Sequence, residues 1–386
     1  MPTAGPLSDL VVVDLTRVLA GPYCTQLLCD LGARVIKVER PGTGDDARAF
    51  GPFIEADSAY FTSINRGKES IALDLKDDGD RRVFDALLAR ADVLVENYRP
   101  GTLARLGYGW DVLHARHPRL IVAATSGFGQ TGPFSERPAY DLIAQAMGGL
   151  MSLTGEPGGS PTRVGTSIGD IAAGLFTAVG VLTALHDRAR TGEGRLVDVA
   201  MLDSQVALLE NAIARYETTG EVPGPIGSRH PSISPFRAFE TADHPIVIAA
   251  GNDALFEKLC ACIGRPELAR DPDFATNTGR TDHEPRLRTA IESVLVTAPS
   301  ADWLARLEEA EVPCGPIQDV EQVLTHPQVN ARGMVAEATT PGGSTLRVAG
   351  QPIKISGFDA PGGGAAPALD GDRASLLAEL GLDADG

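Results

Sequence analysis

The chain has 386 residues, 43% of them apolar and 22% charged, so it can bury a large core and exceeds the size at which a single core stops growing. Its 51 acidic and 34 basic residues give a formal net charge of −17, which disfavours a nucleic-acid partner because phosphate backbones are bound by clustered Lys and Arg. No signal-peptide pattern begins the chain and no apolar run is found that reaches the ~18 residues of a membrane span, so a cytoplasmic protein with no membrane partner is expected.

The N-terminal part of the chain predicts a repeated β–α–β pattern. The first unit comprises a strand, a tight turn, a helix and a second strand, at Leu10–Val13, Thr16–Pro22, Tyr23–Leu31 and Val35–Val38. The pattern recurs as a helix near Asp80–Arg90 that leads into a strand at Val93–Glu96. The apolar run Arg119–Ala124 is typical of a parallel strand covered on both faces. We therefore expect a doubly wound, Rossmann-like α/β lobe.

A long apolar helix is predicted from Asp170 to Arg190. It is apolar nearly all round, which is typical of a helix buried in a core or an interface. A strand at Arg195–Met201 and a helix at Asp203–Tyr216 follow. A Pro- and Gly-rich segment, Gly220–Pro235, then interrupts every period, and we place a lobe boundary there.

Beyond this segment the sequence predicts a smaller α/β lobe. It contains a strand and three helices, at Ile246–Ala249, Ala254–Ile263, Arg286–Val296 and Ala301–Ala310. The turn Val312–Pro316 then leads back to the first lobe. The predicted domains are a large lobe at 1–220, a linker and small lobe at 221–318, and a return to the large lobe at 319–386, with a loose stretch from Gly362 on.

The cysteines are expected to be free thiols. They are odd in number and show no CxxC pair with partner histidines, at Cys24, Cys29, Cys260, Cys262 and Cys314. They therefore match neither a disulfide framework nor a zinc site, and no metal or redox cofactor is implied.

The turn Thr16–Pro22 argues against a nicotinamide enzyme. A dinucleotide-binding lobe carries spaced glycines in this first turn, so that the backbone can approach a pyrophosphate closely. Here the turn contains one glycine, Gly21, followed by Pro22. Glu39 ends the second strand about where a ribose-binding acid would lie, but the glycines that would make a nucleotide site are missing.

Asp170 has two interpretations from the residues alone. It follows Gly169 at the start of the apolar helix, where an Asp can accept a backbone hydrogen bond as an N-cap, and capping is the commoner role. A carboxylate at a helix start, beside a glycine that leaves open space, can also attack a thioester carbonyl. Spacing does not decide between the two.

Short segments spread over nearly the whole chain carry a family resemblance. They are Val13–Pro22, Asp30–Pro41, Gly44–Arg48, Asn65–Ile71, Val95–Gly101, Gly127–Pro133, Tyr140–Asp141, Ile168–Asp170 and Val312–Pro316. Together they resemble the class III CoA-transferase family, also called the CaiB–BaiF family of CoA-transferases and acyl-CoA racemases. Residues 137–155 and 44–46 look most like the succinyl-CoA:dicarboxylate members, such as the glutarate transferases. The extra glycine-rich loop of the formyl-CoA and oxalate branch is not found between Gly220 and Gly251.

The resemblance implies an enzyme that moves CoA from an acyl-CoA donor, expected to be succinyl-CoA, to a free carboxylic acid, expected to be a dicarboxylate. In the family the aspartate at the position of Asp170 attacks the acyl-CoA, giving a mixed anhydride and then an aspartyl-CoA thioester. Positioning would supply much of the rate, because a carboxylate is a poor nucleophile unless it is held in line. We expect Gly169 and the helix start to leave backbone N–H groups free for the developing oxyanion.

The resemblance also implies contacts with CoA. They fall at Val18, Leu19, Arg40, Leu73, Lys76, Asn97, Tyr98 and Arg105. An otherwise acidic protein needs local cations for the phosphates of CoA. Several of these positions have an ordinary alternative, as an exposed charge at Arg40, Lys76 and Arg105 or as a core residue at Leu73.

Further residues are expected to line the active site, at Arg17, Arg48, Tyr140, Gly169 and His230. A dicarboxylate needs a cation for its distal carboxylate, and the candidates are Arg17, Arg48, Arg66 and Arg137, although an ordinary surface ion pair is commoner for any one of them. His230 either lines the cleft or shapes a turn. Tyr140 stands where the racemase branch carries a histidine, and a tyrosine is poorly suited to accept a proton at neutral pH.

Two alternatives stay open. The runner-up is a 2-methylacyl-CoA racemase, which the missing histidine at position 140 disfavours. The other is a CoA-binding relative without catalysis, against which the retention of Asp170 argues. The resemblance further implies an interlocked homodimer and no cofactor beyond CoA itself as substrate.

Overall fold

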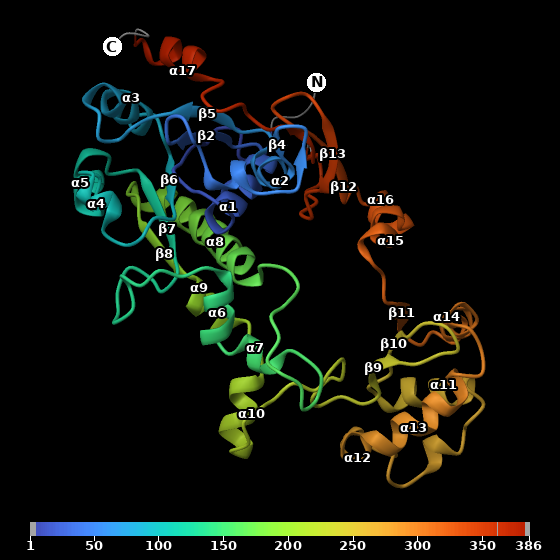
Figure 1. Cartoon of the computed structure of the whole chain (residues 1–386). Coiled ribbons are helices and arrows are strands. Elements are labelled where there is room, and N and C mark those ends of the chain that lie inside the picture. Colours follow the sequence, from blue (N-terminus) through green and yellow to red (C-terminus); the bar gives the residue numbers. More distant parts are fainter. Residues whose placement is uncertain (1–4, 361, 383–386) are drawn as a thin grey trace. The chain divides into compact units, whose positions relative to one another are not determined.

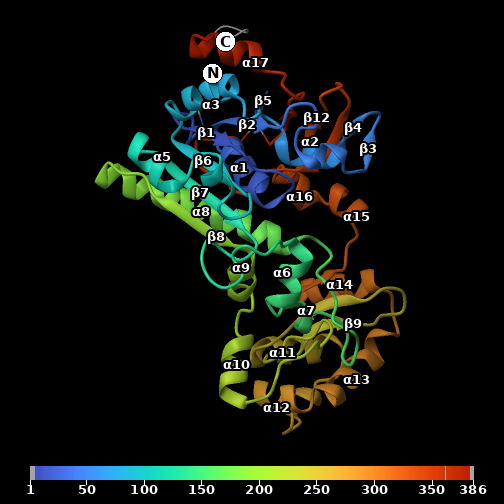
Figure 2. The same cartoon turned by 60° about the vertical axis from the view of Figure 1, so that its left-hand side comes forward.

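The computed structural model describes residues 5–360 and 362–382, which form two compact units. The first unit holds the described residues as far as Met151, then Arg163–Glu221, and those from Pro327 on; the second holds Ser152–Thr162 and Val222–His326. The chain thus leaves the first unit, builds the second and returns (Figures 1 and 2). The domain limits at 220/221 and 318/319 stay a prediction, because compactness does not show which segments fold independently.

The first unit is built on a six-stranded sheet in which every neighbouring pair is parallel. Its strands are β1 Val11–Asp14, β2 Arg34–Glu39, β5 Glu69–Ala72, β6 Val93–Glu96, β7 Ile121–Ser126 and β8 Leu196–Ala200. Their order in space is β5-β2-β1-β6-β7-β8, which confirms the predicted doubly wound, Rossmann-like lobe. The order reverses between β1 and β6, so the carboxyl ends of these two strands form the topological switch point.

Helices cover both faces of this sheet because successive strand residues point to opposite faces. Val13 and Leu94 belong to a core with α3, α4, α5 and α17, whereas their neighbours Val12 and Val93 belong to a core with α1 and α8. Helices α1 and α8 lie side by side on their face (Figure 1). The helices are α1 Ala20–Asp30, α3 Asp78–Leu88, α4 Thr102–Arg105, α5 Trp110–Arg116, α8 Ile168–Thr191 and α17 Arg373–Leu380.

Shorter elements complete the first unit. A second sheet has the order β13-β12-β14, and a two-stranded sheet pairs β3 with β4. The remaining bounds are β3 Phe53–Ile54, β4 Asp57–Ser58, α2 Ala59–Asn65, α6 Asp141–Met147, α9 Met201–Ala207, α10 Ala212–Thr219, α16 Pro327–Ala331, β12 Val335–Thr339, β13 Thr345–Ala349 and β14 Gly364–Ala365, with a 3-10 turn at Asp46–Ala49. Helix α7, Leu150–Leu153, begins in the first unit and ends in the second.

Helix α8 spans 24 residues, three more than predicted, and is, by length and composition alone, able to cross a membrane. That test tolerates up to two charged residues, and the uncharged stretch of α8, between Asp170 and Asp187, stays shorter than 18 residues. A single such helix is weak evidence of a membrane protein, because the core helices of water-soluble proteins pass the same test. One side of α8 is buried against α1 and β7.

Other predicted elements also need correction. The helix predicted at 203–216 is two helices, α9 and α10, because the chain between them turns with a left-handed φ of 54° at Glu210. The predicted turn Val312–Pro316 contains a strand, β11 Cys314–Pro316, that pairs with β10 Ile246–Ala249. The described part of the stretch from Gly362 on is not loose throughout, since Leu376 and Leu377 of α17 are buried in the core beside α3.

The second unit is a small α/β fold. A three-stranded antiparallel sheet has the order β11-β10-β9, and Phe239, Ile248 and Ile291 belong to its core with the surrounding helices. The bounds are β9 Phe236–Phe239, β10 Ile246–Ala249, α11 Asp253–Cys262, α12 Asn277–Asp282, α13 Glu284–Leu295, α14 Ser300–Glu309, β11 Cys314–Pro316 and α15 Val320–Thr325, with a 3-10 turn at Leu268–Arg270. All five cysteines of the chain are free thiols, as predicted.

Candidate active site

A cavity of about 140 Å³ opens in the first unit at the switch point of the sheet. Ligands of open α/β sheets bind at the carboxyl ends of the strands at such a point. The volume is below the ~300–1,000 Å³ of typical small-molecule pockets, so it suits the reacting ends of substrates rather than a whole coenzyme. The lining residues are Arg17–Ala20, Asp46, Asn97–Pro100, Thr125–Gly127, Arg137–Tyr140, Asp170 and Met201.

Asp170 brings a carboxylate to this cavity from the first turn of α8. The helix begins at Ile168 with Ser167 as its N-cap, so Asp170 is the third helical residue and the capping interpretation is wrong. Burial and the nearby Asp141 carboxylate raise the pKa of Asp170 to about 7. Within the described residues no cation and no hydrogen bond opposes this rise. The carboxylate therefore lines the cavity without an ion pair or a hydrogen bond to any other described side chain.

Asp141 fixes the start of α8. Its Oδ1 accepts the Gly169 N–H at 2.8 Å, and its Oδ2 accepts a hydrogen bond from Gln145 Nε2 at 2.7 Å. A Cβ at Gly169 would lie 2.9 Å from Asp141 Oδ1, so the glycine permits this close approach. Because the Gly169 N–H is already bound, it is not free for an oxyanion, and that expectation is wrong for Gly169.

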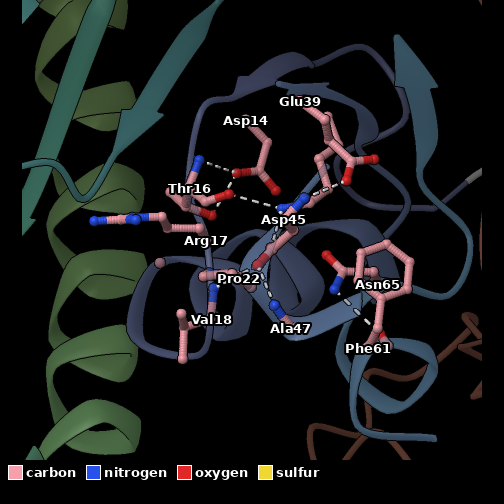
Figure 3. Close-up of polar contacts among 12 residues, drawn as sticks. Asp14, Thr16, Arg17, Val18, Pro22, Glu39, Asp45, Ala47, Phe61 and Asn65 are labelled. Atoms are coloured by element: carbon pink, nitrogen blue, oxygen red, sulfur yellow. Dashed lines mark hydrogen bonds and ion pairs between the residues drawn. The ribbon is translucent and has the colours of Figure 1, made fainter. Parts of the chain in front are cut away.

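The loop between β1 and α1 is held by side chains rather than by backbone pairing. Asp14 Oδ1 accepts the Thr16 N–H at 2.8 Å, as Figure 3 shows. Asn97, which follows β6, accepts the Arg17 N–H at 2.9 Å and donates to the Arg17 carbonyl at 2.8 Å. In a dinucleotide enzyme the backbone N–H groups of this turn would face a phosphate. Here side-chain oxygens already accept hydrogen bonds from the N–H groups of Thr16 and Arg17.

Val18 continues this loop in a strained conformation. Its φ is 66°, in the left-handed region that β-branched residues rarely adopt. Asp45 Oδ1 accepts the N–H groups of Val18 and Ala47, both at 2.9 Å (Figure 3). Asp45 Oδ2 lies 2.8 Å from Lys37 Nζ, and both side chains are fully buried. Burial opposes the charge on Lys37, but the carboxylates of Asp14 and Asp45 outweigh it and raise the pKa of Lys37.

Two of the four candidate arginines serve the interior of the unit. Arg48 donates to both carboxylate oxygens of Glu39, at 2.8 and 2.6 Å, and its guanidinium lies 3.8 Å from the centre of the Phe61 ring. Arg66 pairs with Asp30 at 2.8 Å in a buried position. Neither arginine lines the cavity. The structure therefore places Arg48, an expected active-site residue, beside Glu39 and Phe61 and outside the cavity lining.

The other two candidate arginines line the cavity. Arg17 Nη1 lies 2.8 Å from Asp46 Oδ2. The Arg137 guanidinium lies 4.5 Å from the centre of the Phe134 ring. These two residues, with the cavity-lining Arg99, bring positive charge to the cavity that holds Asp170.

The predicted CoA contacts divide into two groups at the carboxyl edge of the sheet. The first lines the cavity and comprises Val18, Leu19, Asn97 and Tyr98. The second lies outside the cavity, in the segments after β2, β5 and β6, and comprises Arg40, Leu73, Lys76 and Arg105. Leu73 is buried in the core, whereas the three basic side chains of this group are exposed.

Tyr140 and His230 lie in different units. Tyr140 lines the cavity, immediately before α6, and its side chain is 76% exposed. His230 lies in the second unit, where its Nδ1 accepts the Ser232 N–H at 3.1 Å and its ring centre lies 5.4 Å from that of Phe236. These contacts match the turn-shaping interpretation of His230.

Comparison with known proteins identifies the family. The model of CoA-transferase family III matches residues 7–373. The chain belongs to this family. It is 48% identical to an acetyl-CoA:oxalate CoA-transferase of Acetobacter aceti, over 97% of this chain and 96% of that protein. It is 39% identical to a succinate–glutarate CoA-transferase of Agrobacterium fabrum, again over 97% and 96%. A solved structure of a CaiB/BaiF family protein from Brucella suis is 41% identical, with a TM-score of 0.85, and covers 98% of this chain and 100% of that one.

Sequence reasoning missed several residues of this CoA-transferase around Asp170. Tyr60 on α2 is one, because burial and the Asp170 carboxylate raise the pKa of its hydroxyl to about 12, which keeps it a neutral hydrogen-bond donor. The roles of Asp46 and Asp141 were also missed. No spacing in the sequence links these residues to Asp170, since the fold alone brings them together. At the end of β6, Glu96 accepts the N–H of the cavity-lining Tyr98 at 2.6 Å, and burial raises the pKa of Glu96 to about 7.

Proposed function

We propose that this CoA-transferase moves CoA from an acyl-CoA donor to a dicarboxylic acid and that Asp170 is its covalent nucleophile. The observation that carries the proposal is the Asp170 carboxylate in the switch-point cavity, without a paired cation and with a pKa of about 7. A nucleophile needs a free electron pair aimed at open space, and a carboxylate in an ion pair would not offer one. The names of the two relatives, for oxalate and for glutarate, support a dicarboxylate.

The reaction follows from the chemistry of a carboxylate. Ionised Asp170 attacks the thioester carbonyl carbon and the carbon–sulfur bond breaks. CoA is released as a thiolate, and the acyl group stays on Asp170 as a mixed anhydride. The thiolate then attacks the Asp170 carbonyl of the anhydride, which releases the donor acid and leaves an aspartyl-CoA thioester. The acceptor carboxylate reverses these steps, so CoA passes to it and Asp170 is regenerated. The net reaction exchanges one carboxylate for another on CoA and so is close to energetically neutral, and positioning supplies much of the rate.

An exchange assay tests this proposal. Acetyl-CoA and succinyl-CoA are offered in turn with oxalate, glutarate, mesaconate, malate or acetate, and the acyl-CoA products are identified by mass spectrometry. The variant is Asp170→Asn, and the matched control is Asp203→Asn, because Asp203 is also the third residue of its helix but is exposed. We expect new acyl-CoA species from the wild type and the control and none from Asp170→Asn. Full turnover by Asp170→Asn would refute the nucleophile.

The expected homodimer is also proposed. The outer side of α8 carries Leu175, Phe176, Val179 and Leu182, which are 45%, 42%, 59% and 38% exposed in the single chain. The neighbouring helix α6 adds Leu142, Ile143 and Met147, between 43% and 48% exposed. Exposed apolar residues gathered on two neighbouring helices are typical of a protein interface. It supports a second copy of the chain as the partner, while the cytoplasmic location stays a prediction from the sequence.

A further inference from the structure

A dicarboxylate acceptor requires a cation in the cavity that holds Asp170. Its reacting carboxylate must reach Asp170, so its second, non-reacting carboxylate lies a few bonds away and needs a cation within the same small cavity. The arginines that line this cavity are Arg17, Arg99 and Arg137. Arg99 is exposed, and within the described residues no hydrogen bond, ion pair or ring contact holds its guanidinium in place, so the comparison is between Arg17 and Arg137.

The backbone of Arg17 is held from two sides. Asn97 accepts its N–H at 2.9 Å and donates to its carbonyl at 2.8 Å, so both backbone groups of Arg17 are bound to one side chain from another strand end. The next N–H, of Val18, is bound at 2.9 Å by Asp45, whose carboxylate is anchored by the buried Lys37. The residue that carries the guanidinium is thus fixed before any substrate arrives, which reduces the entropy lost on binding.

The guanidinium of Arg17 is oriented but not saturated. Its Nη1 lies 2.8 Å from Asp46 Oδ2, with both side chains partly exposed, at 43% and 40%. A guanidinium has five N–H donors in a planar fork, and this contact uses one nitrogen. The side chain points away from Asp14, Glu39 and Asp45 (Figure 3). Arg17 therefore keeps donors for a second carboxylate.

Arg137 lacks comparable support. Its guanidinium lies over the ring of Phe134, 4.5 Å from the ring centre, and that ring is itself 38% exposed. The backbone N–H of Arg137 donates to the carbonyl of the same Phe134 at 2.9 Å. Both contacts belong to one loop, so they do not tie Arg137 to the sheet as Asn97 ties Arg17.

We propose that Arg17 is the specificity-determining residue that binds the non-reacting carboxylate of the acceptor, and that Asn97 and Asp46 are positioning residues for it. This inference rests on the proposed transfer of CoA to a dicarboxylate. A role in binding the CoA pyrophosphate fits Arg17 less well, because Arg17 lines the same small cavity as Asp170, whereas the pantetheine arm separates the pyrophosphate from the thioester that Asp170 would attack.

The test compares two acceptors that differ only at the distal end. Glutarate and pentanoate both have five carbons, but pentanoate carries a methyl group in place of the second carboxylate. The kcat/KM for each is measured with the wild type, Arg17→Gln and Arg137→Gln, using acetyl-CoA as the donor because its acyl group has no distal carboxylate. We expect Arg17→Gln to lower the preference for glutarate over pentanoate by about 10- to 100-fold, the effect of losing a charged hydrogen-bonding partner, and Arg137→Gln to change it by less than about threefold.

Two results would overturn the inference. Equal loss of both acceptors in Arg17→Gln would make Arg17 a CoA contact or a structural residue, and loss of the preference in Arg137→Gln alone would assign the role to Arg137. A binding measurement separates this inference from the proposed function. Calorimetry of glutarate and pentanoate in the presence of CoA needs no turnover, so a glutarate preference that Arg17→Gln removes would support the inference even if no CoA exchange were detected. Equal binding of both acids by the wild type would refute it.

The positioning role of Asp46 has a separate readout. Asp46→Asn removes the charge that orients the Arg17 guanidinium but leaves Arg17 in place. We expect the KM for glutarate to rise about three- to tenfold, because the Arg17 guanidinium loses the contact that orients it. The kcat and the KM for pentanoate should stay within about twofold, because a partly exposed ion pair contributes little to stability on its own. A fall in kcat with both acceptors would instead show a structural role.

Discussion

The protonation state of Asp170 links its environment to its chemistry. Burial and Asp141 raise its pKa to about 7, so at pH 6 most of the side chain is the neutral acid, which cannot attack a thioester. We expect kcat/KM to fall close to tenfold per pH unit below about 7 and to level off above it, because the profile of kcat/KM reports groups of the free enzyme. Measuring the profile from pH 5.5 to 9 checks this. A flat profile between pH 5.5 and 8 would contradict it.

Asp141 gives a way to move that profile. In Asp141→Asn the side-chain oxygen can still accept the Gly169 N–H, which lies 2.8 Å from Asp141 Oδ1, but the negative charge that raises the pKa of Asp170 is gone. The pKa of Asp170 should fall, so the acid limb of the kcat/KM profile should shift to lower pH, by up to about one unit for the loss of a nearby like charge. Activity at pH 8.5 should change little. An unshifted limb would show that burial alone sets the pKa.

Single residues also show how far sequence reasoning reaches. The Gly–Asp pair at 169–170 could be singled out because both residues are adjacent in the chain. The occupation of the Gly169 N–H could not, because its partner Asp141 comes from another helix, 28 residues earlier. The ion pairs of Arg48 with Glu39 and of Arg66 with Asp30 could not be predicted for the same reason, because only the fold brings these residues close.

The loop between β1 and α1 shows what elements add to residues. The single glycine of its turn predicted that the backbone could not cradle a pyrophosphate, and the structure gives the physical reason, since Asp14 and Asn97 bind the N–H groups of Thr16 and Arg17. The left-handed Val18 was not predictable, because its conformation depends on Asp45, which lies beyond the second strand.

The adjacent Asp45 and Asp46 provide a matched pair for testing this loop. Asp45→Ala removes the carboxylate that lies 2.8 Å from Lys37 Nζ in a fully buried site and leaves only Asp14 and Glu39 to offset the buried charge, so we expect a loss of about 3–5 kcal/mol in the free energy of unfolding. Asp46→Ala breaks a pair that is about 40% exposed and should cost less than about 1 kcal/mol. Urea unfolding of both variants measures the difference. If Asp45→Ala does not fold, Asp45→Asn, which keeps an acceptor for Val18, should lie between the two. Equal costs at the two positions would show that Lys37 is not held by Asp45.

The boundaries of an element could be predicted from the sequence where the pattern that defines the element lies within its own residues. The strand at Val93–Glu96 and the strand at Ile246–Ala249 were predicted with the bounds they have, because each centres on a short run of Val, Ile or Leu residues. The helix predicted at 203–216 was wrong because its periodicity continues through a break, where Glu210 adopts a left-handed φ. The strand Cys314–Pro316 was missed because it exists only through pairing with β10.

At the scale of the whole molecule, alternation of strands and helices was sufficient to predict the doubly wound sheet. It was not sufficient to predict which cations meet at the switch point, since the cavity draws on segments between Arg17 and Met201. The same limit applies to quaternary structure. An apolar helix predicted to be buried in a core or an interface turns out to have one side in the core and the other exposed in the single chain.

That exposed side of α8 leads to a prediction about assembly. Leu175, Val179 and Leu182 are spaced four and three residues apart and so lie on one side of the helix. If this side binds a second copy, Val179→Glu, at the most exposed of the three positions, should place a charge in the contact and raise the dimer dissociation constant by at least about tenfold.

The control variant is Val112→Glu, on α5, where Val112 is 39% exposed. It makes the same change on another helix and should leave the dimer intact. Light scattering on a sizing column over a range of concentrations distinguishes the two variants. A wild type that is monomeric at all concentrations would exclude the dimer, and a dimer unaffected by Val179→Glu would place the interface elsewhere than the apolar side of α8.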